Sequence, residues 1–218
     1  MEKESKKLEA TQLFILFLVL FILVGFLSPQ RSTQNAVDDK QPEQAISKDY
    51  ATYVQQGSTK LDLKDYKGAI KDFSQAIKLD PKNAEAYINR GNARGDLEDY
   101  KGAIKDYNQA IKLDPNNACA YNVRGLARGY MLSDFQGAIK DYSQAIKLDP
   151  NNALAYSSRG LARDTLGDCQ GAIKDYNKAI ELDPKNAKTY NMRSNTRKWL
   201  GDEEGAARDY SKYLELLK

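Results

Sequence analysis

Histidine is absent from this 218-residue chain, and cysteine occurs only as Cys119 and Cys169. The chain therefore lacks the commonest general base and metal ligand, and two scattered thiols provide no disulfide framework. One bridge between them stays arithmetically open, but such thiols in a helical chain are typical of small buried or groove-lining side chains. No nucleophile elbow, phosphate-binding loop or metal-ligand spacing is found. We expect no enzymatic activity, no cofactor and no metal.

An excess of one charge is also lacking, because 33 Lys and Arg stand against 30 Asp and Glu, for a net charge of +3. Non-specific nucleic-acid binding requires a concentrated cationic face, and the composition gives none. The 41% of hydrophobic residues is sufficient for one folded domain with appendages. Composition therefore leaves the class of partner open.

One apolar run, Leu13–Leu27, contains only apolar residues and Gly. As a helix it spans about 22 Å, short of a hydrocarbon core of about 30 Å, and extension back to Leu8 recovers the span. The alternative is a cleaved signal peptide, because three lysines precede the run, but no small-x-small cleavage pattern follows Leu27. We predict a single transmembrane anchor at residues 13–27, after a short flank at 1–12.

The flanking charges and the next segment define the expected topology. Three lysines precede the apolar run and only Arg31 and Lys40 follow it closely, which favours a cytoplasmic N-terminus and a domain on the non-cytoplasmic side. Residues 28–49 are polar, contain two prolines and have no helical apolar period. We predict a flexible linker there, reaching about 25 Å.

The rest of the chain repeats itself. Leu-Asp-Pro recurs with prolines at 81, 115, 150 and 184, at spacings of 34, 35 and 34 residues. This period is the signature of stacked helix pairs. Alignment on the prolines gives five units, at residues 50–83, 84–117, 118–152, 153–186 and 187–218.

Each unit is predicted to form two helices, A and B, because apolar and small residues recur at three- and four-residue spacing in two stretches. In the second unit, A covers about 84–97 and B about 100–113, and Pro115 prevents continuation. An Asp or Asn that can cap free backbone amides stands before every expected helix. These residues are Asp49, Asn83, Asn117, Asn152 and Asn186 before A, and Asp65, Asp99, Asp134, Asp168 and Asp202 before B.

Small and aromatic residues recur in fixed columns. Small residues permit helices to approach closely, and aromatic rings fill the space between them. The columns are Gly57, Gly91, Gly125 and Gly160 in A; Ala69, Ala103, Ala138, Ala172 and Ala206 in B; and the aromatic Phe73, Tyr107, Tyr142, Tyr176 and Tyr210 in B.

In this period, in the order of the Tyr, Gly, Ala, aromatic, Ala and Pro columns, and in the Leu-Asp-Pro ending, residues 50–218 resemble the tetratricopeptide repeat (TPR) family. The resemblance implies an all-α, right-handed superhelical solenoid of helix-turn-helix repeats. It also implies a concave surface, lined mainly by A helices, that holds a peptide or a partner's helix. The last unit departs from the pattern at Ser194, Glu203 and Tyr213, which suggests a terminal cap.

Two basic columns in A and one acidic column in B are nearly constant. Constant columns are expected to serve the fold, so we predict that each Asp pairs with Arg, since a partly buried guanidinium requires a carboxylate. The alternative is an unpaired Arg ladder that binds nucleic acid or another polyanion, beside which base-stacking aromatics would be expected. The columns are Arg90, Arg124, Arg159 and Arg193; Lys60, Arg94, Arg128, Arg163 and Arg197; and Asp72, Asp106, Asp141, Asp175 and Asp209.

Variable columns are free to serve recognition, and the TPR resemblance places twelve variable residues in a partner-binding groove. They are Glu85, Ile88, Asn92, Cys119, Asn122, Leu126, Leu154, Ser157, Leu161, Lys188, Asn191 and Asn195. The apolar members, edged by Asn and Lys, suit an amphipathic helix or an extended peptide; the alternative is packing against neighbouring helices. The Lys and Asn that grip a C-terminal carboxylate in some members are missing, which disfavours chaperone-tail binding.

Three features stand outside the repeat. The extra residue of the third unit falls in the turn 129–134, where Tyr130 and Met131 either protrude as a contact or take a buried place that leucine fills elsewhere. Trp199, late in the last expected A helix, likewise either protrudes as a contact or takes a buried place. The terminal leucines have no following helix to cover them, which raises self-association through Leu214, Leu216 and Leu217 as a hypothesis.

The combined expectation is a membrane-anchored scaffold or adaptor that binds protein partners and performs no chemistry. The GAIxDYxxAI form of the repeat resembles repeats common in photosynthetic bacteria and plastids, where anchored members help to assemble photosynthetic complexes. Assembly of a membrane complex is therefore part of what the resemblance implies.

Overall fold

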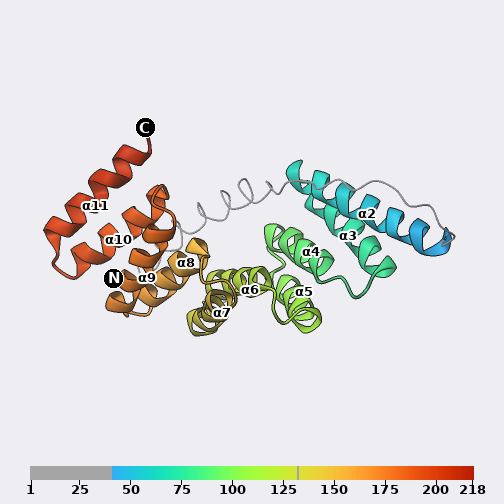
Figure 1. Cartoon of the computed structure of the whole chain (residues 1–218), viewed down its shortest axis with the longest axis horizontal. Coiled ribbons are helices and arrows are strands. Elements are labelled where there is room, and N and C mark those ends of the chain that lie inside the picture. The colour runs from blue at the N-terminus through green and yellow to red at the C-terminus, as the bar shows by residue number, and fades with distance from the viewer. Residues whose placement is uncertain (1–40, 132) are drawn as a thin grey trace. The chain divides into compact units, whose positions relative to one another are not determined.

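The computed structural model describes residues 41–131 and 133–218, and this part of the chain forms ten α-helices and no strand (Figure 1). The chain divides into two units, Met1–Asp49 and Tyr50–Lys218. The predicted flank, anchor and most of the predicted linker lie outside the described residues. Among the helices that are described, none is long and apolar enough to span a membrane.

Each of the five sequence repeats contains one A helix and one B helix. The A helices are α2 (Gln41–Asp62), α4 (Ala84–Asp96), α6 (Ala118–Met131), α8 (Ala153–Thr165) and α10 (Ala187–Trp199). The B helices are α3 (Tyr66–Leu79), α5 (Tyr100–Leu113), α7 (Phe135–Leu148), α9 (Cys169–Leu182) and α11 (Glu203–Leu216). From α3 onward each helix packs against the next, and α4 also contacts α6, α6 contacts α8, and α8 contacts α10. Helix α2 meets α3 through Gly57 against Phe73 and Lys60 against Asp72. The helices α4, α6, α8 and α10 therefore form one continuous surface, called here the A-helix surface.

Helix α2 begins earlier than the sequence analysis predicted. It starts at Gln41, so residues 41–49 are helical where a flexible linker was expected, and Asp49 lies inside the helix instead of capping it. Pro42 falls in the first turn, where its missing N–H costs no helical hydrogen bond, and Glu, Gln, Ala and Lys after it are good helix formers. The missing apolar period therefore did not exclude a helix.

The predicted caps of the B helices are confirmed. Before α5, Asp99 Oδ1 accepts a hydrogen bond of 3.0 Å from the backbone N–H of Gly102, and a Cβ on Gly102 would clash with the Asp99 carboxylate. The same Asp-to-Gly contact begins the other four B helices. An Asn side chain caps α4, α6, α8 and α10. Each cap satisfies a backbone N–H that the helix itself leaves without a partner.

The predicted small and aromatic columns meet in the core. A Cβ built on Gly91 would lie 2.5 Å from Cε1 of Tyr107, and a Cβ on Gly57, Gly125 or Gly160 would lie 2.7–2.9 Å from the ring on the next B helix. Between repeats, Ala76 and Ile77 of α3 pack with Ala86 of α4. Glycine is therefore required in the A helices of the first four repeats, because an aromatic ring lies directly against its backbone.

Candidate protein-binding site

The arginine columns of the A helices are bound to aspartates. Arg159 Nε lies 2.9 Å from Asp175 Oδ2, and Arg159 Nη2 lies 2.7 Å from Asp175 Oδ1. Arg163 Nη1 adds a third bond, 2.8 Å from Asp175 Oδ2. The same arrangement surrounds Asp106, Asp141 and Asp209. The predicted pairing is confirmed, and these charge-assisted bonds compensate the burial of each carboxylate.

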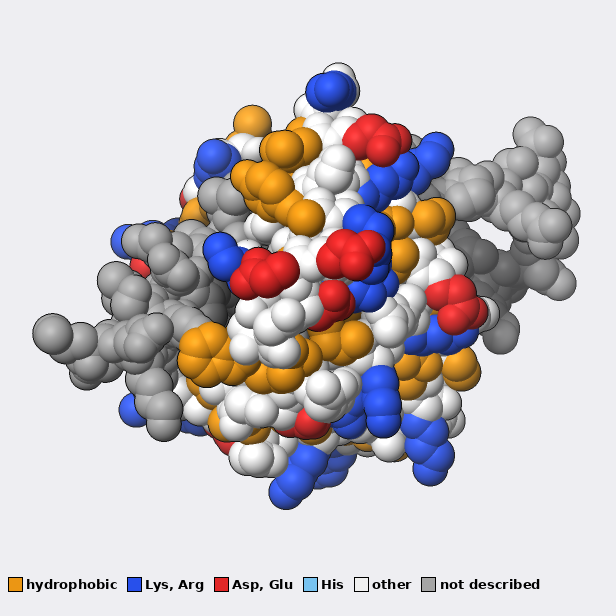
Figure 2. Space-filling view, turned by 90° about the vertical axis from the view of Figure 1, so that its left-hand side faces the viewer, with side chains coloured by type: hydrophobic (Ala, Val, Ile, Leu, Met, Phe, Trp, Pro, Cys, Tyr) orange, Lys and Arg blue, Asp and Glu red, His pale blue; other side chains and the backbone are white. Residues whose placement is uncertain are grey.

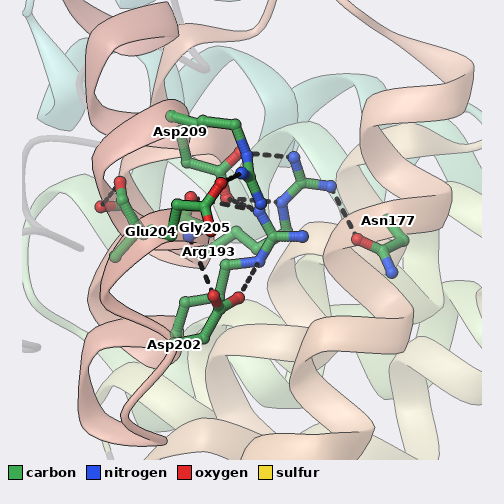
Figure 3. Close-up of polar contacts among 10 residues, drawn as sticks. Asn177, Arg193, Asp202, Glu204, Gly205 and Asp209 are labelled. Carbon is green, nitrogen blue, oxygen red and sulfur yellow. Dashed lines mark hydrogen bonds and ion pairs between the residues drawn. The ribbon is translucent and has the colours of Figure 1, made fainter.

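The first arginine of each unit also reaches back to the preceding repeat. Arg159 Nη1 lies 3.1 Å from Ser143 Oγ, and Arg193 Nη1 lies 2.6 Å from Asn177 Oδ1 (Figure 3). Arg159 also stacks over Tyr156, 5.6 Å from the ring centroid. Within units two to five, these arginines join helix to helix and repeat to repeat, so they form no ladder of unpaired cations. The first unit differs, because Lys60 is the one cation among the described residues that binds Asp72, at 2.6 Å.

All twelve residues predicted to line a groove lie on α4, α6, α8 and α10, three on each helix, but their exposure differs. The exposed ones are Glu85, Cys119 and Asn195. Those half-buried are Asn92, Leu154, Leu161, Lys188 and Asn191. Those buried are Ile88, Asn122, Leu126 and Ser157.

The predicted apolar patch is divided by this burial. Ile88 and Leu126 are each only 6% exposed, so the expectation that they contribute open surface is wrong, and the alternative of packing against neighbouring helices holds for them. The physical reason is that α4 contacts α6, and each A helix covers part of the next one. Leu154 and Leu161 remain half-exposed, two turns apart on one side of α8.

The polar residues of the surface divide in the same way. Asn92 Oδ1 accepts a hydrogen bond of 2.9 Å from the Tyr107 hydroxyl, and Ser157 Oγ donates one of 3.0 Å to the Leu154 carbonyl. Asn122 differs, because its Oδ1 is buried and has no hydrogen-bond partner among the described residues. A buried acceptor without a donor costs about 1–3 kcal/mol.

Electrostatics identify one residue that the sequence analysis missed. Burial raises the pKa of Asp96, at the end of α4, to about 6. At the equivalent position, the other units with described side chains have Asp62, Thr165 and Trp199. The position is therefore variable, and the search for variable columns could have identified Asp96.

Ionizable groups elsewhere on this surface are shifted as well. Burial, and then the Glu85 carboxylate, raise the pKa of the Cys119 thiol, although its side chain is exposed to solvent. Burial lowers the pKa of Lys188. Among the described residues, no group of three or more Cys, Asp or Glu side chains could hold a metal ion.

The structure also places the features outside the repeat. Trp199 is 60% exposed, which confirms the interpretation of a protruding side chain. Met131 ends α6, and the side chains of Tyr130 and Met131 lie outside the described part, so their role stays a prediction.

Comparison with known proteins defines the family. The profile described as Tetratricopeptide repeat matches residues 84–117, and the profile described as TPR repeat matches 53–97, 130–167 and 165–195, which together span more than half of the chain. The protein therefore belongs to the tetratricopeptide repeat family, whose members are generally scaffolds without enzymatic activity. A search of curated proteins gave no match.

Solved structures include several similar chains. A crystal structure of MamA is 30% identical over 73% of this chain and 93% of that chain, with a TM-score of 0.67. MamA from Desulfovibrio magneticus RS-1 is 23% identical over 77% of this chain and 94% of that chain, with a TM-score of 0.69. PilW, described as a type IV pilus biogenesis factor, is 20% identical over 77% of each chain, with a TM-score of 0.72. The last two likenesses show the fold alone.

Proposed function

We propose that this protein is a membrane-anchored TPR scaffold that binds a peptide or helix of a protein partner on the A-helix surface. The observation that carries this proposal is the pair of half-exposed leucines on α8, Leu154 and Leu161, which lie two turns apart on a helix that contacts both α6 and α10. A ligand with two apolar side chains at matching spacing covers both.

The rim of the surface gives the ligand a direction. At the second position of α4, α6, α8 and α10 the residues are Glu85, Cys119, Leu154 and Lys188. A ligand that lies across these helices therefore meets a carboxylate at one end and an ammonium group at the other. We expect the bound segment to carry a basic residue toward α4 and an acidic residue toward α10.

Structural neighbours support a binding role of this kind. YrrB, at 20% identity and a TM-score of 0.63, is described as a TPR protein with an unusual peptide-binding site. PilW is described as a factor in biogenesis of the type IV pilus. A role in assembly of a membrane complex fits the apolar run at residues 13–27 of this chain, which supports the anchoring part of the proposal.

The binding experiment uses the tagged full-length protein, solubilised in detergent, and compares partners recovered by two double variants. Leu154→Glu with Leu161→Glu places charges on the A-helix surface, and Leu97→Glu with Leu166→Glu is the control, with two exposed leucines in the turns after α4 and α8. We expect specific partners to be lost only with the first variant, while circular dichroism shows unchanged helicity in both. Equal retention by both variants would place recognition elsewhere.

The alternative, polyanion binding through the arginine columns, is tested by the salt dependence of binding. Neutralisation of phosphates releases counterions, so such binding falls steeply as salt is added. Protein-partner binding through leucines has a weak salt dependence. A steep salt slope, together with retention by the Leu154 and Leu161 variant, would favour the polyanion alternative.

Anchoring and orientation are tested separately from binding. Resistance to extraction from membranes by alkaline carbonate supports an anchor at residues 13–27, and loss of that resistance when the run is interrupted by charged residues ties it to this segment. Cys119 is exposed and reports the side of the membrane. A membrane-impermeant maleimide that labels Cys119 in intact cells supports a non-cytoplasmic solenoid, and labelling only after lysis contradicts that orientation.

A further inference from the structure

Helix α4 ends in a carboxylate that has no partner in the described part of the chain. Asp96 is the last residue of this helix, and its side chain is half-buried. It makes no hydrogen bond and no ion pair with any described residue, and burial is the cause of its raised pKa. A half-buried charge without a partner loses part of its hydration and gains no contact in return.

Every other buried or half-buried acid in the described part does have a partner. Asp164 accepts a hydrogen bond from the Cys169 thiol. The aspartates that bind Arg or Lys are Asp72, Asp106, Asp141, Asp175 and Asp209, and those that accept a backbone N–H are Asp80, Asp114, Asp149 and Asp183. Exposed acids also adjoin cations, as Figure 2 shows at the α10 and α11 end of the chain. Asp96 therefore departs from the way this chain pairs its acids.

The position of Asp96 on the helix also disfavours a lone anion. It lies at the C-terminal end of α4, where the helix dipole is negative and repels a carboxylate. The repeat does not require an acid there, because the equivalent residues are Thr165 in α8 and Trp199 in α10. A cation brought to Asp96 by another molecule would relieve both the dipole repulsion and the lost hydration.

Three tyrosines surround the Asp96 carboxylate. Tyr66 begins α3, Tyr100 begins α5, and Tyr107 lies in the middle of α5. Burial raises the pKa of each hydroxyl, and the Asp96 charge raises it further, which places the carboxylate near all three. The Tyr107 hydroxyl is occupied, because it donates to Asn92 Oδ1. The rings of Tyr66 and Tyr100 are only half-buried, and aromatic faces attract cations.

Asp96 belongs to the face of α4 that forms part of the A-helix surface. It follows Glu85 by eleven residues, which at about 100° per residue brings both to within about 20° of each other around the helix. The two carboxylates thus mark opposite ends of one row, about 16 Å apart. Glu85 is exposed and Asp96 is half-buried, so a cation gains more at Asp96, where water screens the charge less.

We propose that Asp96 receives a basic side chain, lysine or arginine, of the protein segment that binds the A-helix surface. The rings of Tyr66 and Tyr100 flank the bound ammonium or guanidinium group, and the carboxylate selects it over a neutral side chain. One carboxylate among neutral phenols suits an organic cation, whereas a metal ion requires several charged or carbonyl ligands. This inference rests on the proposed function and defines the chemistry of one position of the ligand.

Peptide selection tests the site. The probe is a random-peptide library displayed on phage, panned against the tagged full-length protein in detergent. Wild type and Asp62→Asn, which removes the exposed carboxylate at the equivalent position of α2, are expected to enrich peptides with Lys or Arg at one fixed place relative to apolar residues. Asp96→Asn should keep the apolar residues and lose the basic one, and Asp96→Lys should select Asp or Glu there.

The outcomes separate this inference from the proposed function. Selection of the same basic residue by Asp96→Asn would overturn the role of Asp96 and leave binding on the A-helix surface intact. If no protein enriches any peptide, wild type included, both the proposed function and this inference are overturned. Circular dichroism of each variant shows that helicity is unchanged.

Affinities of one selected peptide measure the coupling. Isothermal titration of the full-length protein compares that peptide with a version in which norleucine replaces the basic residue. The replacement is expected to weaken binding to wild type roughly tenfold or more, and binding to Asp96→Asn by about twofold or less. Leu154→Glu with Leu161→Glu should abolish binding of both peptides, which reads out the proposed function alone. Equal weakening in wild type and Asp96→Asn would show that the basic residue contacts another group, and would overturn the inference.

Discussion

Arg159 binds Asp175 through two parallel hydrogen bonds, 2.9 Å from Nε to Oδ2 and 2.7 Å from Nη2 to Oδ1. The fork geometry matches guanidinium to carboxylate and fixes helix α8 against α9. Because Arg159 also contacts Ser143 of α7, one side chain joins three helices of two repeats. Such a contact recurs in every unit from the second to the fifth. Loss of one aspartate is therefore expected to destabilise the preceding repeat as well as its own.

Asp175→Asn is therefore expected to lower the free energy of unfolding by about 3 kcal/mol or more, because two partly buried arginines lose their carboxylate. The matched control is Asp72→Asn in the first repeat, where the only cation bound is Lys60, 36% exposed. We expect about 1 kcal/mol or less there. Chemical denaturation followed by circular dichroism measures both, and equal losses would contradict the role assigned to the arginine pair.

Gly91→Ala is expected to destabilise the protein by about 1–3 kcal/mol, because its Cβ would lie 2.5 Å from Cε1 of Tyr107 and the ring would have to move. Gly95→Ala, one turn later on the same helix, is the control. Its Cβ would meet only the Tyr107 hydroxyl, at 3.9 Å, so we expect a gain of about 0.5–1 kcal/mol from reduced backbone entropy of the unfolded chain. Thermal and chemical unfolding should rank the variants in opposite directions around the wild type.

Asp96 is expected to make stability fall as pH rises. Burial raises its pKa in the folded state from 3.8 to about 6, so between these values the folded chain holds a proton that the unfolded chain has released. The penalty is absent below about pH 4 and complete above about pH 6. Asp96→Asn should then stabilise the protein near pH 7, by on the order of 1 kcal/mol, and have little effect at pH 4.

The control is Asp62→Asn, at the equivalent position of the first repeat, where the side chain is exposed. At pH 7 this substitution should change the free energy of unfolding by about 0.5 kcal/mol or less, as is usual for exposed side chains. Carboxyl titration by NMR provides a direct reading, and a midpoint for Asp96 near 4 would refute the assigned burial effect.

The two thiols are expected to react very differently. Cys119 is exposed, whereas Cys169 is buried. The pKa of both thiols is raised, that of Cys169 to about 11, chiefly by burial and further by Asp164, so accessibility is what separates them. Because the thiolate is the reactive form, maleimide at neutral pH should modify Cys119 alone in the folded protein and both residues in denaturant. Mass spectrometry of the labelled peptides decides the matter, and native labelling of Cys169 would show that α9 opens.

The rate of Cys119 labelling also tests whether a partner binds on the A-helix surface. Cys119 lies at the second position of α6, between Glu85 and Leu154 on the neighbouring A helices. A ligand on the A-helix surface should slow its modification, while the rate at a cysteine introduced at the exposed Glu98 turn stays constant. An unchanged rate at Cys119 with partner present would exclude the central part of this surface.

Much of the site chemistry was predictable because contacts recur. The offset from Arg124 to Asp141 is nearly the offset from Arg159 to Asp175, so internal comparison exposed the pairing without any coordinates. The capping aspartates and the glycine under each ring follow for the same reason. The sequence correctly assigned the twelve groove residues to A helices, but it did not predict which of them are buried.

The sequence by itself determined the repeat period, the helix pairs, the caps and the charge pairing, because each depends on residues at short, fixed separations. Only the tertiary structure decided that Ile88 and Leu126 are buried, that Asn122 Oδ1 has no described partner and that Tyr210 turns outward. Burial is a property of what surrounds a side chain. Equivalent positions therefore differ in exposure between repeats, because different side chains and helices lie against them.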